Sequence, residues 1–273
     1  MNTNTTRREA VIAALAVLAA RPVGAQTLAP PSKAVVASIA PSGRLLAAFN
    51  AGNPVLAVRN LATGEVTGVT VDIANELGRR LGVPVDLKVY TDGNQLMPGL
   101  AADHWNIALL ALDPNRAGEL AFTAPYLLLE GTYLVREAAP YRSAVELDRE
   151  GLIISAGAGS AYDMALTRGL KHASIARAAN TPAANAAFLN GDQYAALAGV
   201  RQMLANTARA NPGHRILPDA FGTIEQGIGI PHGHEVGQRY LTDFVETLKR
   251  SGFIRASLDR HGQTDAIVAP SRP

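Results

Sequence analysis

The sequence has 273 residues and contains no cysteine. This absence excludes disulfide bonds, thiolate nucleophiles, iron–sulfur clusters and cysteine-bound zinc, and it excludes a lipid anchor on an N-terminal cysteine. Tryptophan occurs once and aromatic residues make up 5% of the chain, which leaves few side chains to stack on nucleic-acid bases. The Gly-x-Ser-x-Gly, His-Glu-x-x-His and Ser-x-x-Lys signatures of known enzyme classes are also missing. Past residue 25, no apolar run reaches the roughly 20 residues that a membrane-spanning helix needs.

The first 25 residues have the pattern of an export signal. Arg7 and Arg8 precede an apolar run over residues 10–20, which is too short to span a bilayer. Small residues then lead to a cleavage site that we expect after Ala25. The arginine pair fits a twin-arginine signal, and ordinary secretory signals also begin with basic residues, so the export route stays open.

The formal net charge of +2 belongs to this segment. Removing residues 1–25 takes away three arginines and one glutamate, and the remaining chain is neutral by count. No cluster of Lys and Arg is left that could follow a phosphate backbone, so we expect no nucleic-acid partner. The mature product is expected to be soluble and exported.

Short apolar runs alternate with helical patterns from residue 44 onward. Strands are predicted over residues 44–49, 85–90 and 107–112, with helices over 71–81 and 94–102 between them. This order predicts an α/β fold in which helices cover a parallel sheet. Because no low-complexity linker separates this set from the next, we expect two lobes joined by strands. The second set has predicted strands over 152–155 and 224–230 and predicted helices over 161–169, 182–190, 200–210 and 239–251.

Several segments occur in the order and spacing of a known family. Together they resemble the extracellular solute-binding proteins of type II fold that serve polar amino-acid uptake transporters, from about residue 45 to residue 262. The segments are Gly64–Val83, Asp113-Pro114-Asn115-Arg116, Phe122-Thr123-Ala124-Pro125-Tyr126, Gly159-Ser160 and Leu189-Asn190-Gly191.

The resemblance implies a two-lobed clamp with a mostly parallel, helix-flanked sheet in each lobe. The first lobe would comprise residues 42–130 and 223–262, and the second lobe residues 131–222. Two crossover segments, residues 128–135 and 222–230, would form the hinge. Ligand would bind in the cleft between the lobes and close it, as in other hinged binding proteins.

The implied function is that of the periplasmic substrate-binding component of an ABC importer. Such a protein captures a small carboxylate-bearing solute, an amino acid or a related organic acid, and presents it to an inner-membrane permease and ATPase. We expect a monomer with no catalytic activity, cofactor or metal. Outside the lobes, residues 26–41 are expected to form a flexible lead-in and residues 263–273 a C-terminal tail.

Arg116 is the first candidate for ligand binding. The family places an arginine here to hold the ligand's carboxylate, and a guanidinium matches a carboxylate with two parallel hydrogen bonds. Gly159 and Ser160 are the next candidates, because backbone N–H groups at the start of a helix bind anions. Ser160 also fits an ordinary helix N-cap, and the two interpretations are compatible.

Other positions depart from the family's pattern. Asp113 stands where the family has threonine, and it could pair with Arg116 or take up a ligand cation. Tyr194 stands at the position that we assign to the family's ammonium-binding aspartate, and a tyrosine carries no charge at neutral pH. A standard α-amino acid is therefore only one of the ligands that fit, beside organic acids without an ammonium group. Four further residues complete the candidate site: Asn50, Asn53, Leu110 and Ala111.

Two alternative functions stay open. Some relatives of these binders are periplasmic dehydratases of prephenate-like acids, and Glu130 or Asp113 could act as the general acid that such a reaction needs. A sensory binding protein that reports ligand occupancy to a separate receptor is the other alternative. A metal site at His232 and His234 is not expected, since the sequence shows no third ligand near them.

Overall fold

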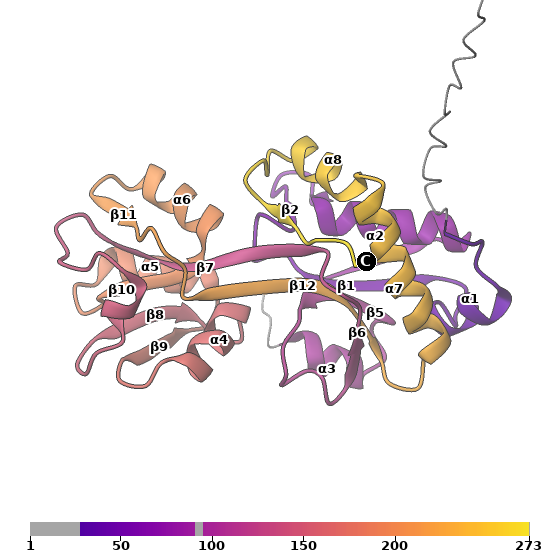
Figure 1. Ribbon diagram of the computed structural model, residues 1–273, viewed down its shortest axis with the longest axis horizontal. Helices are drawn as coiled ribbons and strands as arrows, with labels where there is room; N and C mark the ends of the chain where they lie inside the picture. Colours follow the sequence, from indigo (N-terminus) through magenta and orange to yellow (C-terminus); the bar gives the residue numbers. More distant parts are fainter. Residues whose placement is uncertain (1–27, 91–94, 273) are drawn as a thin grey trace, which may run out of the picture.

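The computed structural model describes residues 28–90 and 95–272. The predicted export signal, residues 1–25, lies outside the described residues. Figure 1 shows two groups of helices and strands that are linked by two long strands running side by side. We call the group that carries the C-terminal end of the chain the first lobe and the other group the second lobe.

The strands that link the lobes are β7 (Leu127–Arg136) and β12 (Gly222–Pro231). They pair antiparallel, with Gly222 opposite Gly131, over the two segments predicted to be crossovers. β12 also pairs with strands of the first lobe, and β7 with strands of the second. One eleven-stranded sheet therefore runs through the described residues of both lobes, and the crossovers are part of it rather than loose linkers.

The first lobe is built on three parallel strands, with β1 (Leu45–Asn50) between β4 (Val85–Tyr90) and β5 (Ile107–Ala111). Helix α2 (Val69–Leu81) precedes β4, and helix α3 (Leu96–Ala101) precedes β5. The predicted strands and helices of this region are confirmed to within two residues at each end. Three short strands complete the region: β2 (Val58–Arg59), β3 (Val66–Thr67) and β6 (Leu120–Phe122).

Helix α2 illustrates how the sequence specifies these elements. Ile73, Leu77 and Leu81 recur every four residues and are all buried, as expected for an amphipathic helix against a sheet. The helix ends at Gly82, whose φ of 70° is left-handed and whose N–H donates to the carbonyl of Gly78. Glycine adopts this conformation without the Cβ clash that other residues meet, so it stops the helix at this point.

The second lobe repeats the arrangement. β8 (Ile153–Gly157) lies between β9 (Ser174–Ala178) and β10 (Ala196–Val200), and all three strands are parallel. Helix α4 (Ala161–Gly169) connects β8 to β9, and its bounds are those predicted. The remaining elements are the 3₁₀ helix η2 (Ala144–Leu147), α5 (Thr181–Asn190), α6 (Arg201–Ala210) and β11 (His214–Ile216).

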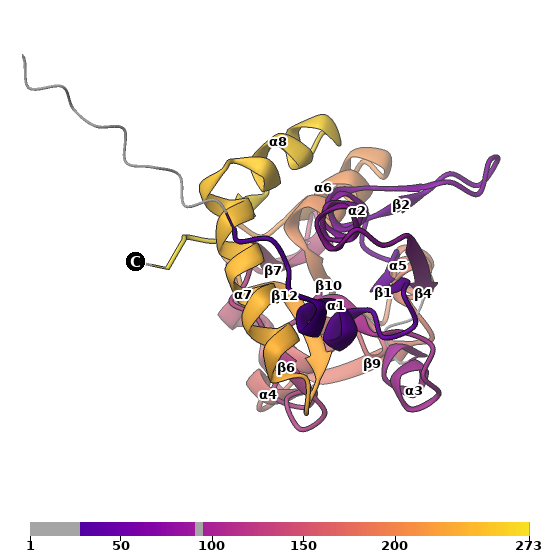
Figure 2. The ribbon, with the colours of Figure 1, turned by 90° about the vertical axis from the view of Figure 1, so that its right-hand side faces the viewer.

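The chain returns to the first lobe after β12 and ends there. Helix α7 (Glu235–Arg250) buries Leu241, Phe244 and Leu248 on one face, and helix α8 (Phe253–Arg260) follows it. Helix α7 contacts both α8 and α1, and Figure 2 shows α1 beside α7. Within the described residues, none of the helices is both long and apolar enough to cross a membrane.

The prediction of a flexible lead-in is wrong for residues 33–39, which form helix α1 (Lys33–Ile39). The hydroxyl of Ser32 caps the helix by accepting from the N–H of Val35. Val35 and Ile39 are buried, and the helix packs against α7. The local sequence does not predict this helix, because the helix is stabilised by burying two apolar side chains against α7, which is distant in sequence.

The predicted C-terminal tail is also tied to the first lobe. Its strand β13 (Ile267–Val268) pairs antiparallel with Leu127 and Leu128 at the start of β7. The ammonium of Lys249 donates to the carbonyl of Pro270 at 2.9 Å and forms a buried ion pair with Glu246. The tail is therefore held by the sheet on one side and by α7 on the other.

Candidate functional site

A pocket lies between the two lobes, where the carboxyl ends of the parallel strands meet. In each lobe the chain adds strands on both sides of the first one, β1 or β8, and such a switch point opens a crevice at the strands' carboxyl ends. The pocket is lined by residues after β1, at the end of β5, at the start of α4 and α5, and on β12. Its volume of about 70 Å³ favours a small ligand, since drug-sized ligands occupy roughly 300–1,000 Å³.

Arg116 lines this pocket from the first lobe and is 9% exposed. Among the described residues, its guanidinium donates one hydrogen bond, from Nη1 to the carbonyl of Ala111 at 3.1 Å, which leaves other N–H groups for a ligand. Burial lowers the pKa of Arg116, and the negative charge of Asp113 opposes that shift. A guanidinium stays protonated in proteins even so, and Arg116 therefore supplies a fixed positive charge inside the pocket.

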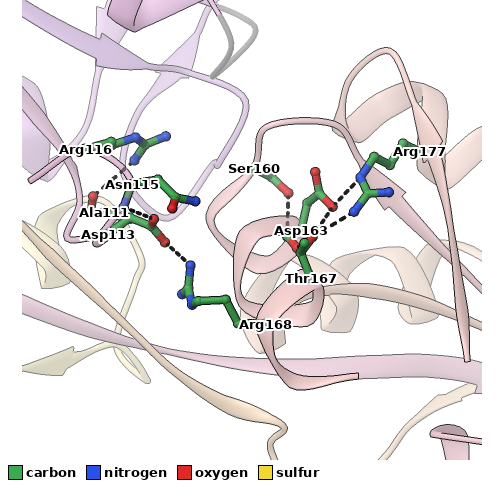
Figure 3. A network of polar contacts seen from close by, with 9 residues as sticks. All are labelled: Ala111, Asp113, Asn115, Arg116, Ser160, Asp163, Thr167, Arg168 and Arg177. Atoms are coloured by element: carbon green, nitrogen blue, oxygen red, sulfur yellow. Dashed lines mark hydrogen bonds and ion pairs between the residues drawn. The ribbon is translucent and has the colours of Figure 1, made fainter. Parts of the chain in front are cut away.

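Asp113 does not line the pocket. Its Oδ2 accepts from Nη1 of Arg168 at 2.7 Å, and its Oδ1 accepts from the N–H of Asn115 at 2.9 Å. Arg168 belongs to α4, so this ion pair joins the two lobes directly, as Figure 3 shows. The Asp113 carboxylate points away from Arg116 in that view, and its partner is an arginine of this chain rather than a ligand cation.

The start of α4 faces Arg116 from the second lobe. Ser160 is the N-cap: its hydroxyl accepts from the N–H of Asp163 at 3.1 Å and donates to the carbonyl of Gly157 at 2.7 Å. The N–H of Gly159 donates to the Asp163 carboxylate at 3.0 Å, so the helix's own side chain already uses that donor. The first backbone N–H groups of a helix have no partner inside it, and here those are the amides of Ala161 and Tyr162, which line the pocket.

Two hydroxyls of the second lobe also line the pocket. The phenol of Tyr162 and Oγ1 of Thr181 are 2.5 Å apart. Burial raises the pKa of Tyr162, with the hydrogen bond to Thr181 opposing that shift, so the phenol is neutral at neutral pH. Sequence reasoning missed both residues, although each lies within a few positions of the carboxyl end of a strand.

The four remaining first-lobe candidates also line the pocket: Asn50, Asn53, Leu110 and Ala111. Asn50 Oδ1 accepts from the N–H of Gly52 at 2.7 Å, and Asn53 Oδ1 accepts from the N–H of Val55 at 3.0 Å. These bonds shape the loop after β1. The amide NH₂ groups of both side chains have no hydrogen-bond partner among the described residues.

Tyr194 does not lie in the pocket. It precedes β10, and its carbonyl accepts from Nη1 of Arg136 at 2.9 Å in a separate surface hollow. The opposite end of β10 reaches the pocket through Val200, preceded by Gly199. The position assigned to an ammonium-binding residue is therefore at the opposite end of this strand from the pocket. Gly199, at the pocket end, has no side chain that could bind an ammonium group.

The residues considered for other chemistry are engaged elsewhere. Glu130 forms an ion pair with Arg201 at 2.5 Å and is not among the pocket residues, so neither acid considered for a dehydratase reaches the ligand space. His232 and His234 contact the carbonyls of Ala117 and Ser38. The described residues contain no group of three His, Asp or Glu side chains suited to a metal ion.

Comparison with known proteins agrees with this fold. The family model of the bacterial extracellular solute-binding proteins, family 3, matches residues 45–264. The chain belongs to this family. The family is one of solute-binding proteins, and the predicted two-lobed type II fold is confirmed by the solved structures that resemble this one.

Three relatives illustrate the similarity. The L-cystine-binding protein TcyJ of Escherichia coli K12 is 20% identical over 195 residues, which cover 71% of this chain and 73% of TcyJ. The amino acid ABC transporter substrate-binding protein AbpA of Streptococcus pneumoniae, solved with L-arginine, has a TM-score of 0.72 at 16% identity, covering 83% of this chain and 98% of AbpA. The ancestral amino acid-binding protein AncCDT-1, a precursor of cyclohexadienyl dehydratase, has a TM-score of 0.70 at 20% identity, covering 82% and 97%.

Proposed function

We propose that this protein is the periplasmic substrate-binding component of an ABC importer, and that it captures a small carboxylate in the pocket between its lobes. The ligand's carboxylate is held by Arg116 on one side and by the first amides of α4 on the other. The bound, closed form then docks on an inner-membrane permease and its ATPase. The relatives that bind amino acids for ABC transporters support this role.

The observation that carries the proposal is the placement of Arg116. It is the charged side chain among the described pocket residues, and it is nearly buried. A buried cation without a carboxylate partner is costly, and Asp113 turns to Arg168 instead. A ligand carboxylate opposite the amides of Ala161 and Tyr162 offsets that cost, because charge-assisted hydrogen bonds are the stronger kind.

A thermal-shift screen with amino acids and short organic acids, followed by calorimetry, tests the proposal. A ligand that binds the folded state alone raises the melting temperature in proportion to its affinity and concentration. Arg116→Ala should weaken binding of every carboxylate hit by about 30-fold or more, since truncating one partner of a buried charged pair costs roughly 2–5 kcal/mol.

Arg149→Ala is the matched control, because it removes an exposed arginine of the second lobe and should leave affinity unchanged. The far-ultraviolet spectrum and cooperative unfolding of Arg116→Ala show whether the variant is folded. Retained affinity in folded Arg116→Ala, or a screen without any carboxylate hit, contradicts the proposal.

A further inference from the structure

Gln226 is a buried polar residue that lines the pocket. It lies on β12, opposite Ala111 of β5 on one side and Leu127 of β7 on the other. Its backbone carbonyl accepts from the N–H of Tyr126 at 2.8 Å. The backbone of Gln226 is thus fixed between two strands at the point where the sheet passes from one lobe to the other.

The side chain of Gln226 faces the pocket. Along β12, Thr223 and Glu225 are exposed, whereas Ile224 and Gln226 are buried and line the pocket. This alternation is that of a strand with one face turned inward. Gln226 is 3% exposed, and its side-chain amide makes no hydrogen bond to any of the described residues.

The pocket that Gln226 lines also contains the apolar side chains of Ile224, Leu110 and Met203, which offer no hydrogen bond. The Gln226 amide therefore has donors and an acceptor that these side chains leave unused. A ligand group that bonds to the amide contributes roughly 0.5–1.5 kcal/mol to binding, whereas a leucine of similar volume would offer no such bond.

The position of Gln226 relative to Arg116 says which part of the ligand it meets. Ala111 is the direct cross-strand neighbour of Gln226, and the carbonyl of the same Ala111 accepts from the Arg116 guanidinium. Cross-strand neighbours lie about 4.5–5.5 Å apart at Cα. A small ligand whose carboxylate is bound by Arg116 therefore brings its adjoining carbon atoms and their substituents within reach of Gln226.

We infer that Gln226 is a specificity-determining residue that reads a neutral, hydrogen-bonding substituent next to the ligand's carboxylate, so that the pocket favours small hydroxycarboxylates. The inference rests on the proposed carboxylate-binding function. A glutamine amide offers one acceptor and two donors and no charge, which suits a hydroxyl. No aspartate or glutamate of the described residues lines the pocket to balance an ammonium.

Calorimetry with three matched ligands tests the inference: propanoate, L-lactate and L-alanine differ only in hydrogen, hydroxyl or ammonium beside the carboxylate. The native protein should bind lactate about tenfold more tightly than propanoate, and alanine no better than propanoate. Gln226→Leu, which keeps a similar volume, should reduce lactate binding to the level of propanoate while leaving propanoate unchanged. Gln226→Glu should reverse the order in favour of alanine.

Unfolding of the ligand-free variants separates this role from a structural one. Gln226→Leu removes an amide without a partner, so its melting temperature without ligand should match or exceed that of the native protein. A large fall in that temperature overturns the inference. So does Arg116-dependent binding in which Gln226→Leu leaves the preference among the three ligands unchanged, and in that case the proposed function stands. If none of the three binds and the wider screen also gives no carboxylate, both proposals fail.

Discussion

Single residues determine the geometry of the pocket. Gly157 is one of them, because it lets the backbone of β8 approach the backbone at the start of α5 closely. Gly157 ends β8, and a Cβ added to it would lie 2.6 Å from the amide nitrogen of Thr181 and 2.8 Å from the carbonyl carbon of Asn180. Both neighbours are backbone atoms at the start of α5, which cannot move aside as a flexible side chain could. The close approach of β8 and α5 thus sets the position of Thr181 in the pocket.

Gly157→Ala should therefore destabilise the protein by about 1–3 kcal/mol, as overpacking usually does, and weaken ligand binding by displacing Thr181. Urea unfolding and calorimetry measure the two effects. Gly169→Ala is the matched control in the same lobe: nothing lies within 4 Å of its added Cβ and its φ is not left-handed. That change should leave stability equal or raise it by roughly 0.4–1 kcal/mol, and equal losses in both variants would contradict the argument.

Residue-level prediction from sequence identified pocket residues where a local motif fixes the geometry, and their contact with a ligand stays a prediction. Arg116 and the N-cap Ser160 depend on a short loop and a helix start, and both lie in the pocket. It failed where the partner is remote. Nothing near Asp113 in sequence indicates that Arg168 binds it. Tyr194 lies outside the pocket because it precedes β10, whereas the opposite end of that strand, at Val200, reaches the pocket. Gln226 lies inside a strand that was predicted correctly. Whether its side chain faces the pocket depends on how that strand pairs with β5 and β7, and the local sequence does not show this pairing.

At the scale of elements, helix α1 shows how a short segment can be part of the core. Its seven residues bury only Val35 and Ile39, too few to give a helical pattern that stands out in the sequence. By contrast, α2 and α7 bury long stripes and were predicted. Most of the elements missed were short, and their stability comes from neighbours rather than from their own residues. They include α8 and the strands β2, β3, β6, β9, β10, β11 and β13.

Truncation of Ile39 tests whether α1 contributes to stability. Ile39 is fully buried, so Ile39→Ala should lower the free energy of unfolding by about 2–5 kcal/mol through lost burial and the cavity left behind. Lys33→Ala, at an exposed position of the same helix, should change it by less than about 0.5 kcal/mol. Chemical denaturation measures both, and a similar small effect of the two substitutions would show that α1 is dispensable.

At the scale of the whole molecule, the ion pair between Asp113 and Arg168 joins the two lobes directly. The Asp113 side chain is 3% exposed and that of Arg168 is 46% exposed. Separation of the lobes would break this pair, and closure would restore it. We therefore expect the pair to favour the closed arrangement before any ligand binds and to contribute to ligand affinity through that preference.

Arg168→Ala should shift the ligand-free protein toward an open arrangement and weaken ligand binding by about tenfold. Small-angle X-ray scattering without ligand should then give a larger radius of gyration than for the native protein. Arg177→Ala is a close control, since Arg177 pairs with Asp163 at 2.9 Å with similar exposure but inside the second lobe. It should leave the radius unchanged, and equal radii for all three proteins would refute a role in closure.

The first lobe is made from two stretches of the chain that the second lobe separates in sequence, and this limits the order in which the lobes can fold. The second lobe comes from one continuous stretch between β7 and β12, so its contacts are near in sequence and form early. The first lobe needs β5 to pair with β12, which joins Ala111 to Gln226. During synthesis that pairing must wait until the second lobe has been made. We therefore expect the edges of β5 and β7 that β12 covers to stay open in the interval, and the first lobe, although begun earlier, to complete its sheet last.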